Sequence, residues 1–232
     1  MALTDGLVGA YKLGDELDYS GLGNDLTNVG STTFSSGLIG NAAILGNSNT
    51  TKNLRTADAL GILKTDDWTV SLFWKAPTTY NLNLAAFDMR YGTSGSGNNN
   101  RFIFIRDHAN NRWSMFNSSF SNSFTTESIT AGTWYNLIFQ KSGSTATFFV
   151  NTVSKASRTT GANTNLSPLG FSLNGADLAW TCSGDVDLLY IWNRAIDSTE
   201  RSEMYNGGAG YEIPIGGGGG VTPNAIAFAG GL

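Results

Sequence analysis

The segment Trp68–Lys75, WTVSLFWK, constrains the fold of this chain more than any other feature. Every second position carries a large apolar residue, and mainly polar residues stand between them. Alternate side chains of a β-strand point to opposite faces of its sheet, so the apolar row lies on one face. The segment therefore predicts a strand with one strongly apolar face, formed by Trp68, Val70, Leu72 and Trp74.

Further strand-like runs follow, with turn residues between them. Two of these runs, 134–141 and 145–151, flank the short turn KSGST and predict a β-hairpin. The closing run, 185–193, has apolar residues on both faces, which predicts either a covering loop or helix or an interface. The other runs are residues 7–13, 42–45, 84–90, 101–106 and 112–116.

One segment, residues 198–206, predicts a helix. Asp197 and Glu200 have the spacing of a capping box, and Gly207 ends the segment. Many strands with one short helix, and no alternation of strands with helices, indicate the fold class. We expect residues 1–210 to form an all-β fold, a two-sheet antiparallel β-sandwich with one short C-terminal helix.

The composition of the 232 residues argues against several kinds of partner. Only 14% are charged and the net charge is -4, so neither nucleic acid nor an anionic membrane is an expected partner. No run approaches the roughly 20 apolar residues of a membrane span, and no secretory signal is visible at the start. The one cysteine, Cys182, excludes an internal disulfide, and we expect it to be a small buried residue.

The C-terminal residues 211–232 predict a linker and an apolar docking tail. Residues 216–220 are five glycines, which make a flexible linker, and residues 221–232 carry no charge. Such a tail docks on another chain, or else it is a frayed or self-packed terminus. The expected docking residues are Ile213, Val221, Ile226, Phe228 and Leu232.

Five segments together resemble the laminin G-like jelly-roll family of the concanavalin A-like superfamily. The most specific is GDVDLLYIWNRAIDSTERSEMY, residues 184–205, which is similar to the family's closing strand and helix. The others are LVGAYKLGDELDYSGLGND, GLIGNAAILG, DWTVSLFWKAP and the segment 132–150. The resemblance implies a convex and a concave antiparallel sheet with the chain ends close together. It leaves function open, because such folds serve many functions.

The acidic residues do not form the pattern that glycoside hydrolysis needs. A retaining mechanism uses two carboxyl groups about 5–5.5 Å apart, and the nearest strand pair is Asp185 and Asp187. These two could be catalytic, metal-binding or structural. A Ser-His-Asp triad would depend on His108, which lies in an expected turn. We therefore predict that the protein is not an enzyme.

The Gly-bent loop of residues 15–25 is a candidate calcium site, because Ca²⁺ prefers carboxylate, amide and carbonyl oxygens. Relatives of this fold often hold calcium near the sheet rim, and the resemblance implies Asp18 and Asn24 as ligands, joined by Asp187. The alternative is an Asx-turn loop without an ion.

A glycan site would combine exposed aromatic rings with amides or carboxylates. Trp68, Trp74 and Trp134 lie on strand faces and are expected in the core. The predicted site residues are therefore Tyr91, Asn98, Asn99, Trp113 and Asn117, with Tyr80 and Asn100 as further candidates in the same loops.

Three functions remain after these exclusions. The first is a structural or adhesive surface component of a larger assembly, such as a bacteriophage virion, held by its C-terminal tail. A virion protein leaves its host by lysis and needs no export signal, so we expect a virion-surface or extracellular location. The second is a free or enzyme-attached carbohydrate-binding module, and virion lectins would satisfy both readings. The third, a glycoside hydrolase, lacks a supporting carboxylate pattern.

Overall fold

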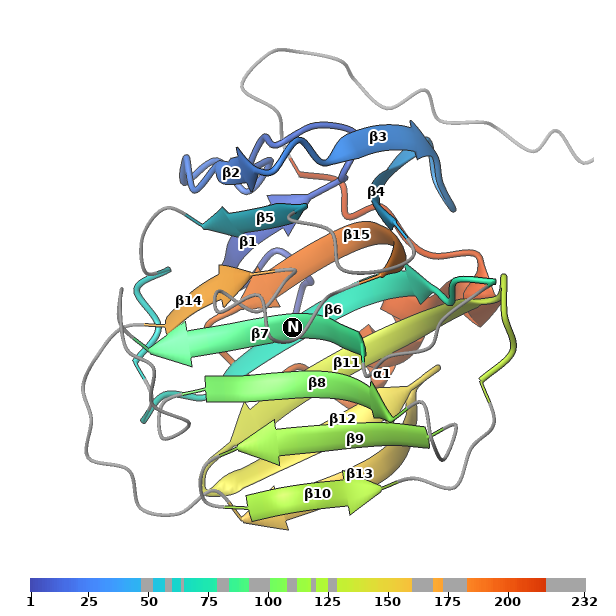
Figure 1. Ribbon diagram of the computed structural model, residues 1–232. Helices are drawn as coiled ribbons and strands as arrows, with labels where there is room; N and C mark the ends of the chain where they lie inside the picture. The colour runs from blue at the N-terminus through green and yellow to red at the C-terminus, as the bar shows by residue number, and fades with distance from the viewer. Residues whose placement is uncertain are drawn as a thin grey trace, which may run out of the picture.

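The computed structural model of the protein is a sandwich of two sheets (Figure 1). It describes residues 1–46, 52–56, 60–63, 65–78, 84–91, 101–107, 112–117, 120–124, 129–159, 169–172 and 183–215. All strand pairs of the described residues are antiparallel, for example β11 (Trp134–Ser142) with β6 (Trp68–Lys75). The predicted all-β sandwich with one short helix near the C-terminal end of the described chain is therefore confirmed.

The described strands form an eight-stranded and a seven-stranded sheet. The eight-stranded sheet has the order β13 (Val153–Thr159), β12 (Thr145–Val150), β11, β6, β15 (Gly184–Trp192), β4 (Asn41–Gly46) and β3 (Thr33–Ser36), and β1 (Leu7–Tyr11) also pairs with β15. The seven-stranded sheet has the order β10 (Phe120–Phe124), β9 (Arg112–Asn117), β8 (Arg101–Asp107), β7 (Leu84–Tyr91), β14 (Leu169–Ser172), β5 (Asn53–Thr56) and β2 (Leu26–Val29).

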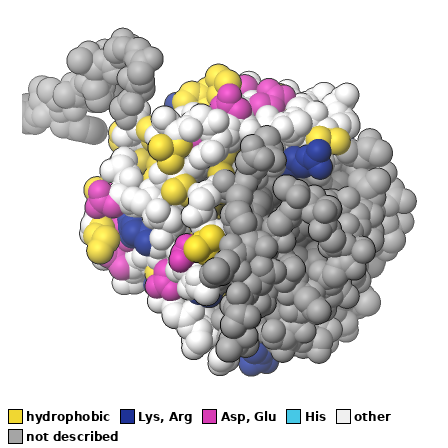
Figure 2. Space-filling model, turned by 90° about the vertical axis from the view of Figure 1, so that its left-hand side faces the viewer, with side chains coloured by type: hydrophobic (Ala, Val, Ile, Leu, Met, Phe, Trp, Pro, Cys, Tyr) yellow, Lys and Arg dark blue, Asp and Glu magenta, His cyan; other side chains and the backbone are white. Residues whose placement is uncertain are grey.

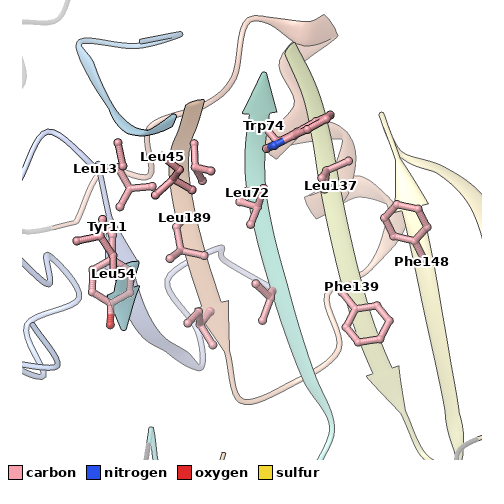
Figure 3. Packing of buried hydrophobic residues seen from close by; sticks show 14 of the residues in the cluster. Tyr11, Leu13, Leu45, Leu54, Leu72, Trp74, Leu137, Phe139, Phe148 and Leu189 are labelled. Atoms are coloured by element: carbon pink, nitrogen blue, oxygen red, sulfur yellow. The ribbon is translucent and has the colours of Figure 1, made fainter. Parts of the chain in front are cut away.

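The alternation in β6 places its apolar row between the two sheets. Trp68 and Leu72 are fully buried there. Leu137 and Phe139 of β11 are buried in the same layer, beside Leu72 (Figure 3). The predicted hairpin is formed by β11 and β12, which pair in continuous register from Leu137 to Ser142. This inner core, the cluster between the sheets, supplies most of the hydrophobic burial of the described chain.

A second cluster, the outer core, lies on the other face of the eight-stranded sheet. It contains Leu188, Tyr190 and Trp192 of β15, while Leu189 and Ile191 of the same strand belong to the inner core. Leu3, Ile196, Met204 and Ile213 cover these side chains. The expectation that a loop or helix covers this doubly apolar strand is thus confirmed, and both described chain ends pack in one place.

Helix α1 (Ser198–Tyr205) begins with the predicted capping box. The Asp197 side chain accepts hydrogen bonds from the backbone N–H groups of Thr199 and Glu200, and the Glu200 carboxylate accepts one from the Asp197 N–H. The helix ends at Asn206, whose left-handed backbone leads into the short 3-10 helix η2 (Asn206–Gly208).

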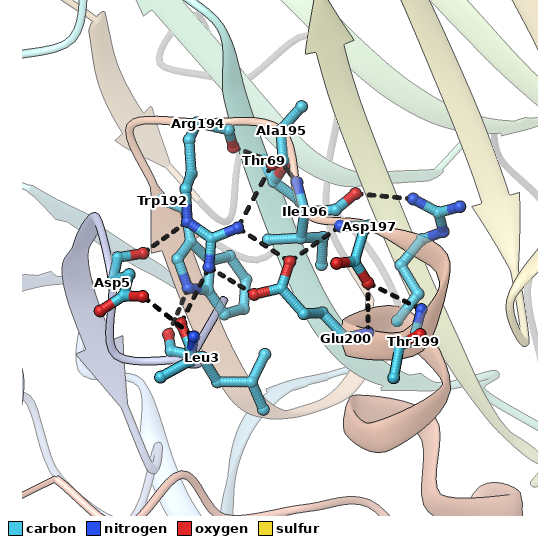
Figure 4. Close-up of polar contacts among 12 residues, drawn as sticks. Leu3, Asp5, Thr69, Trp192, Arg194, Ala195, Ile196, Asp197, Thr199 and Glu200 are labelled. Carbon is cyan, nitrogen blue, oxygen red and sulfur yellow. Dashed lines mark hydrogen bonds and ion pairs between the residues drawn. The ribbon is translucent and has the colours of Figure 1, made fainter.

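Arg194 fastens the N-terminal segment to this helix (Figure 4). Its Nη1 and Nη2 donate to the two Glu200 carboxylate oxygens at 2.8 and 2.6 Å. Its remaining donors reach the backbone carbonyls of Ala2, Asp5 and Ala195. One guanidinium therefore joins the N-terminal segment to the first turn of α1, and we call this group the Arg194 clasp.

The predicted role of Ile213 in partner docking is wrong. Its side chain is 2% exposed in the outer core, and its N–H donates to the Tyr190 hydroxyl at 3.2 Å. Tyr211 and Ile215 pack against the same cluster. Residues 209–215, the C-terminal strap, thus belong to the folded body because their apolar side chains complete its outer core. Val221, Ile226, Phe228 and Leu232 lie outside the described residues.

Candidate functional site

Trp113 does not form the exposed stacking surface predicted for a glycan. It is 1% exposed and lies between the sheets, with its ring 5.2 Å from that of Trp74 in an edge-on arrangement. Tyr135 and Phe148 also lie within 6.2 Å of it. The prediction is wrong because burial in the inner core leaves no ring face for a ligand.

The other predicted glycan residues have no described side chains. Tyr91 ends β7 and Asn117 ends β9, and their side chains fall outside the described part of the structure. Asn98 and Asn99 lie outside the described residues altogether, as do Tyr80, Asn100, His108 and Cys182. Their proposed roles stay predictions.

The Asp18 carboxylate is the centre of the loop 15–25. Its Oδ1 accepts hydrogen bonds from the N–H groups of Ala10 and Ser20, and its Oδ2 accepts from the Ser20 hydroxyl and the Asn24 N–H. The four distances lie between 2.7 and 3.0 Å. Donors from the loop and from β1 thus occupy both carboxylate oxygens that a calcium ion would need.

Asn24 has a similar internal role. Its side-chain amide donates to the backbone carbonyl of Val8, and its backbone carbonyl accepts from the Tyr11 hydroxyl at 2.7 Å. Burial, together with the nearby carboxylates of Asp18 and Asp25, raises the pKa of Tyr11 far above its ordinary range. The hydroxyl therefore stays protonated and holds the loop against β1.

Asp187 lies in a different environment, at a bulge of β15. Its side chain is fully buried; Oδ2 accepts from the N–H groups of Leu38 and Ile39, and Oδ1 accepts from Leu188. Burial raises the pKa of Asp187 to about 6, although these three donors act in the opposite direction. The carboxylate fixes the bulge and the turn at Gly37, where an added Cβ would meet it at 2.5 Å. Its role is structural.

These contacts separate the three predicted calcium ligands. Asp18 and Asn24 share one loop, while Asp187 binds the turn after β3. In the described part of the chain, no group of three or more His, Cys, Asp or Glu side chains is arranged to hold a metal ion. The contacts favour the ion-free Asx-turn alternative for the loop, and calcium binding stays a prediction to be tested by chelation.

Sequence reasoning missed a group of side chains on the outer face of the eight-stranded sheet. Lys75 is directly opposite Trp134 on one side and Asp185 on the other. Its ammonium lies 3.3 Å from Asp185 Oδ2 and 5.7 Å from the centre of the Trp134 ring. All three are partly exposed. We call this group the Trp134 row; the sequence alone placed Trp134 in the core, and only strand register brings the three together.

The face of the molecule in Figure 2 shows no continuous apolar patch among its described residues. On the face in Figure 2, backbone and uncharged polar side chains predominate, with small separate groups of hydrophobic and charged side chains. The exposed large hydrophobic residues of the described part are Met1, Leu17, Leu22, Val29 and Val153. Among the described residues, no helix is long and apolar enough to cross a membrane.

The geometry defines a two-sheet sandwich whose described acidic side chains mostly support loops. A family model described as the concanavalin A-like lectin/glucanases superfamily, of the laminin G type, matches residues 45–200. This is about two thirds of the chain. The chain therefore belongs to this superfamily. No curated protein matches its sequence.

Several solved structures share the fold. Domain 4 of AbnA, an extracellular family GH43 arabinanase from Geobacillus stearothermophilus solved with arabinotriose, has a TM-score of 0.68 at 20% identity, covering 84% of this chain and 96% of that one. The binding domain of Paraclostridial Mosquitocidal Protein 1 gives 0.60 at 15% identity, with 88% and 53% covered.

The match to botulinum neurotoxin type C, whose cell entry depends on two ganglioside molecules, gives a TM-score of 0.65 at 10% identity. It covers 90% of this chain and 52% of the other. The chain thus spans about half of each of these two toxin structures. At these identities the likeness demonstrates the fold.

Proposed function

We propose that this protein is a non-catalytic glycan-binding module that acts outside the cell. The observation that carries the proposal is the likeness to domain 4 of the arabinanase, because nearly the whole of each domain takes part and that domain was solved with arabinotriose. The likeness to the binding domain of the mosquitocidal protein, and to a neurotoxin whose cell entry depends on two ganglioside molecules, supports a binding role for the same fold.

The environment of the two strand aspartates supports the absence of catalysis. Asp187 is fully buried beneath backbone N–H donors, and Asp185 is paired with Lys75. A hydrolytic pair needs one carboxyl group as acid and one as nucleophile or base, both beside the glycosidic bond. A buried carboxylate that fixes a bulge cannot contact a substrate, so this pair is unsuited to hydrolysis.

Glycan binding can be tested by screening the full chain on an array that holds neutral and sialylated glycans together with arabinotriose. We expect dose-dependent binding to a limited set of oligosaccharides, and no cleavage of the bound sugar. Absence of binding to all arrayed glycans would contradict the proposal, and release of reducing ends would show an enzyme.

A second proposal is that the module is held in a larger assembly, such as a bacteriophage virion, by its C-terminal tail. The supporting observation is the strap, because Ile213 anchors the chain to the body three residues before the glycine run begins. Residues 221–232 would then reach a partner. The protein should co-sediment with particles from a producing host, and an Ile226→Asp, Phe228→Asp double variant should not. The surface variant Val153→Asp is the control and should still co-sediment. Co-sedimentation of the double variant would contradict the proposal.

A further inference from the structure

We propose that the Trp134 row is the binding site for an uncharged sugar unit of an oligosaccharide. The inference rests on the proposed function and names the surface at which the module holds its glycan. It starts from strand register: Trp134, Lys75 and Asp185 are direct partners across β11, β6 and β15. Because neighbouring strands are about 4.8 Å apart, the row spans roughly 10 Å of sheet.

The charged members of the row have unused hydrogen-bonding capacity. The Lys75 ammonium carries three donors, and its one hydrogen bond within the described residues goes to Asp185 Oδ2 at 3.3 Å. In the same described part, Asp185 Oδ1 accepts none. The side chains of Lys75 and Asp185 are 37% and 23% exposed to solvent, respectively. A donor and an acceptor side by side match two adjacent sugar hydroxyls, each of which both donates and accepts.

Trp134 supplies apolar area beside these polar groups. Its ring is partly exposed and packs against the outer core, so it is already immobilised before a ligand arrives. A preformed aromatic surface lowers the entropy cost of binding. An indole ring suits a sugar because its apolar face can pack against the sugar's C–H groups, while its N–H can donate a hydrogen bond. An aromatic ring next to paired polar groups is therefore a complete sugar-contact set.

The charge of the row favours an uncharged sugar. Asp185 already neutralises the Lys75 ammonium at close range, so a sialic or uronic acid carboxylate would meet a carboxylate as well as an ammonium. Like charges brought together in this way oppose binding. The row thus differs from a site built for acidic glycans.

A second aromatic, lysine and acid group on the chain provides a matched control. Lys12 forms an ion pair with Glu212 and lies 4.9 Å from the centre of the Tyr19 ring. Here the Tyr19 hydroxyl is already bound to Asp15 at 2.9 Å. The two groups have similar composition, but this one offers less free polar capacity.

The test compares the Lys75→Gln and Asp185→Asn variants with the Lys12→Gln control, after thermal unfolding shows that all three are folded. The neutral array glycan bound best by the wild type, or arabinotriose, is titrated by calorimetry. We expect each row variant to bind about tenfold more weakly or worse, as for loss of a charge-assisted hydrogen bond, while the control binds like the wild type.

Each other outcome overturns the inference in a distinguishable way. Unchanged affinity in both row variants removes this site and leaves the proposed function standing. Equal weakening in Lys12→Gln shows that the effect is not specific to the row, and binding confined to sialylated glycans refutes the sugar class. If the wild type binds no glycan, the proposed function fails with it.

Discussion

Replacing Arg194 by alanine should destabilise the protein more than any exposed charge change. The Glu200 side chain, its bidentate partner, is 4% exposed and Arg194 is 17% exposed. Removing one partner of such a pair leaves an uncompensated buried charge, at a cost of roughly 3–5 kcal/mol. At about 2–4 °C per kcal/mol for a chain of this size, the melting temperature falls by roughly 6–20 °C.

The assay is a double-mutant cycle of Arg194→Ala, Glu200→Ala and the double variant, with stability from urea unfolding. We expect a coupling of about 2–3 kcal/mol, within the range for contacting residues. The control is the exposed pair of Lys12 and Glu212, whose side chains are 41% and 38% exposed, and whose coupling should stay below about 1 kcal/mol.

The pH dependence gives the clasp a second signature. Its hydrogen bonds with Arg194 lower the pKa of Glu200 below its ordinary value. Because its pKa is lowered, the Glu200 carboxylate contributes to the stability of the fold above its unfolded-state pKa. That contribution is lost as pH falls through the folded-state pKa. Arg194→Ala should therefore lose less stability than the wild type on acidification. A coupling no larger than that of the Lys12 pair would refute the reasoning.

Four further changes test other parts of the structure. Trp113→Ala should cost about 3–5 kcal/mol in urea unfolding, and unchanged stability would show that its ring is not buried. Burial raises the pKa of Asp187 to about 6, so the protonated side chain contributes stability that is fully present below its ordinary pKa of 3.8 and is lost as pH rises through 6. Relative to Asp187→Asn, the free energy of unfolding of the wild type should fall by on the order of 3 kcal/mol between pH 4 and 7. Parallel stability curves for the two proteins would contradict this. Gly184 has φ 96°, and an added Cβ would meet the Lys75 carbonyl, so Gly184→Ala should lower the free energy of unfolding by more than about 2 kcal/mol. Unchanged stability would show that the backbone at Gly184 does not have this conformation. EDTA should leave the melting temperature unchanged, because protein donors already hydrogen-bond both carboxylate oxygens of Asp18. A melting temperature that rises on addition of calcium would instead support a calcium site in the loop 15–25.

The sequence predicted the long central strands well, but it predicted the edge strands and the two short inner strands of the seven-stranded sheet poorly. Strands β6, β11 and β15 were found because burial on at least one face requires regular apolar residues. The edge strands β2, β3, β10 and β13 were missed. Strands β5 and β14, which lie inside the seven-stranded sheet, were also missed because four residues are too few to show a clear alternation. In β13, for example, no residue is buried, so its sequence VSKASRT carries no apolar alternation.

Two site residues were misassigned although the sequence held a signal for each. Alternation in RWSMFN puts Trp113 on the same strand face as Met115, which indicates an inward position. Tyr211, Ile213 and Ile215 also alternate, as expected for a packed segment rather than a free tail. The Trp134 row had no such signal, because its members are more than 50 residues apart in sequence and only strand register joins them.

The most direct test of a non-catalytic glycan module is an NMR titration of the wild-type chain with its best neutral oligosaccharide. We predict that the indole N–H signal of Trp134 shifts with saturation while the sugar spectrum keeps its original reducing-end signals. New reducing-end signals, or no shift of any protein signal with any glycan, would contradict the account.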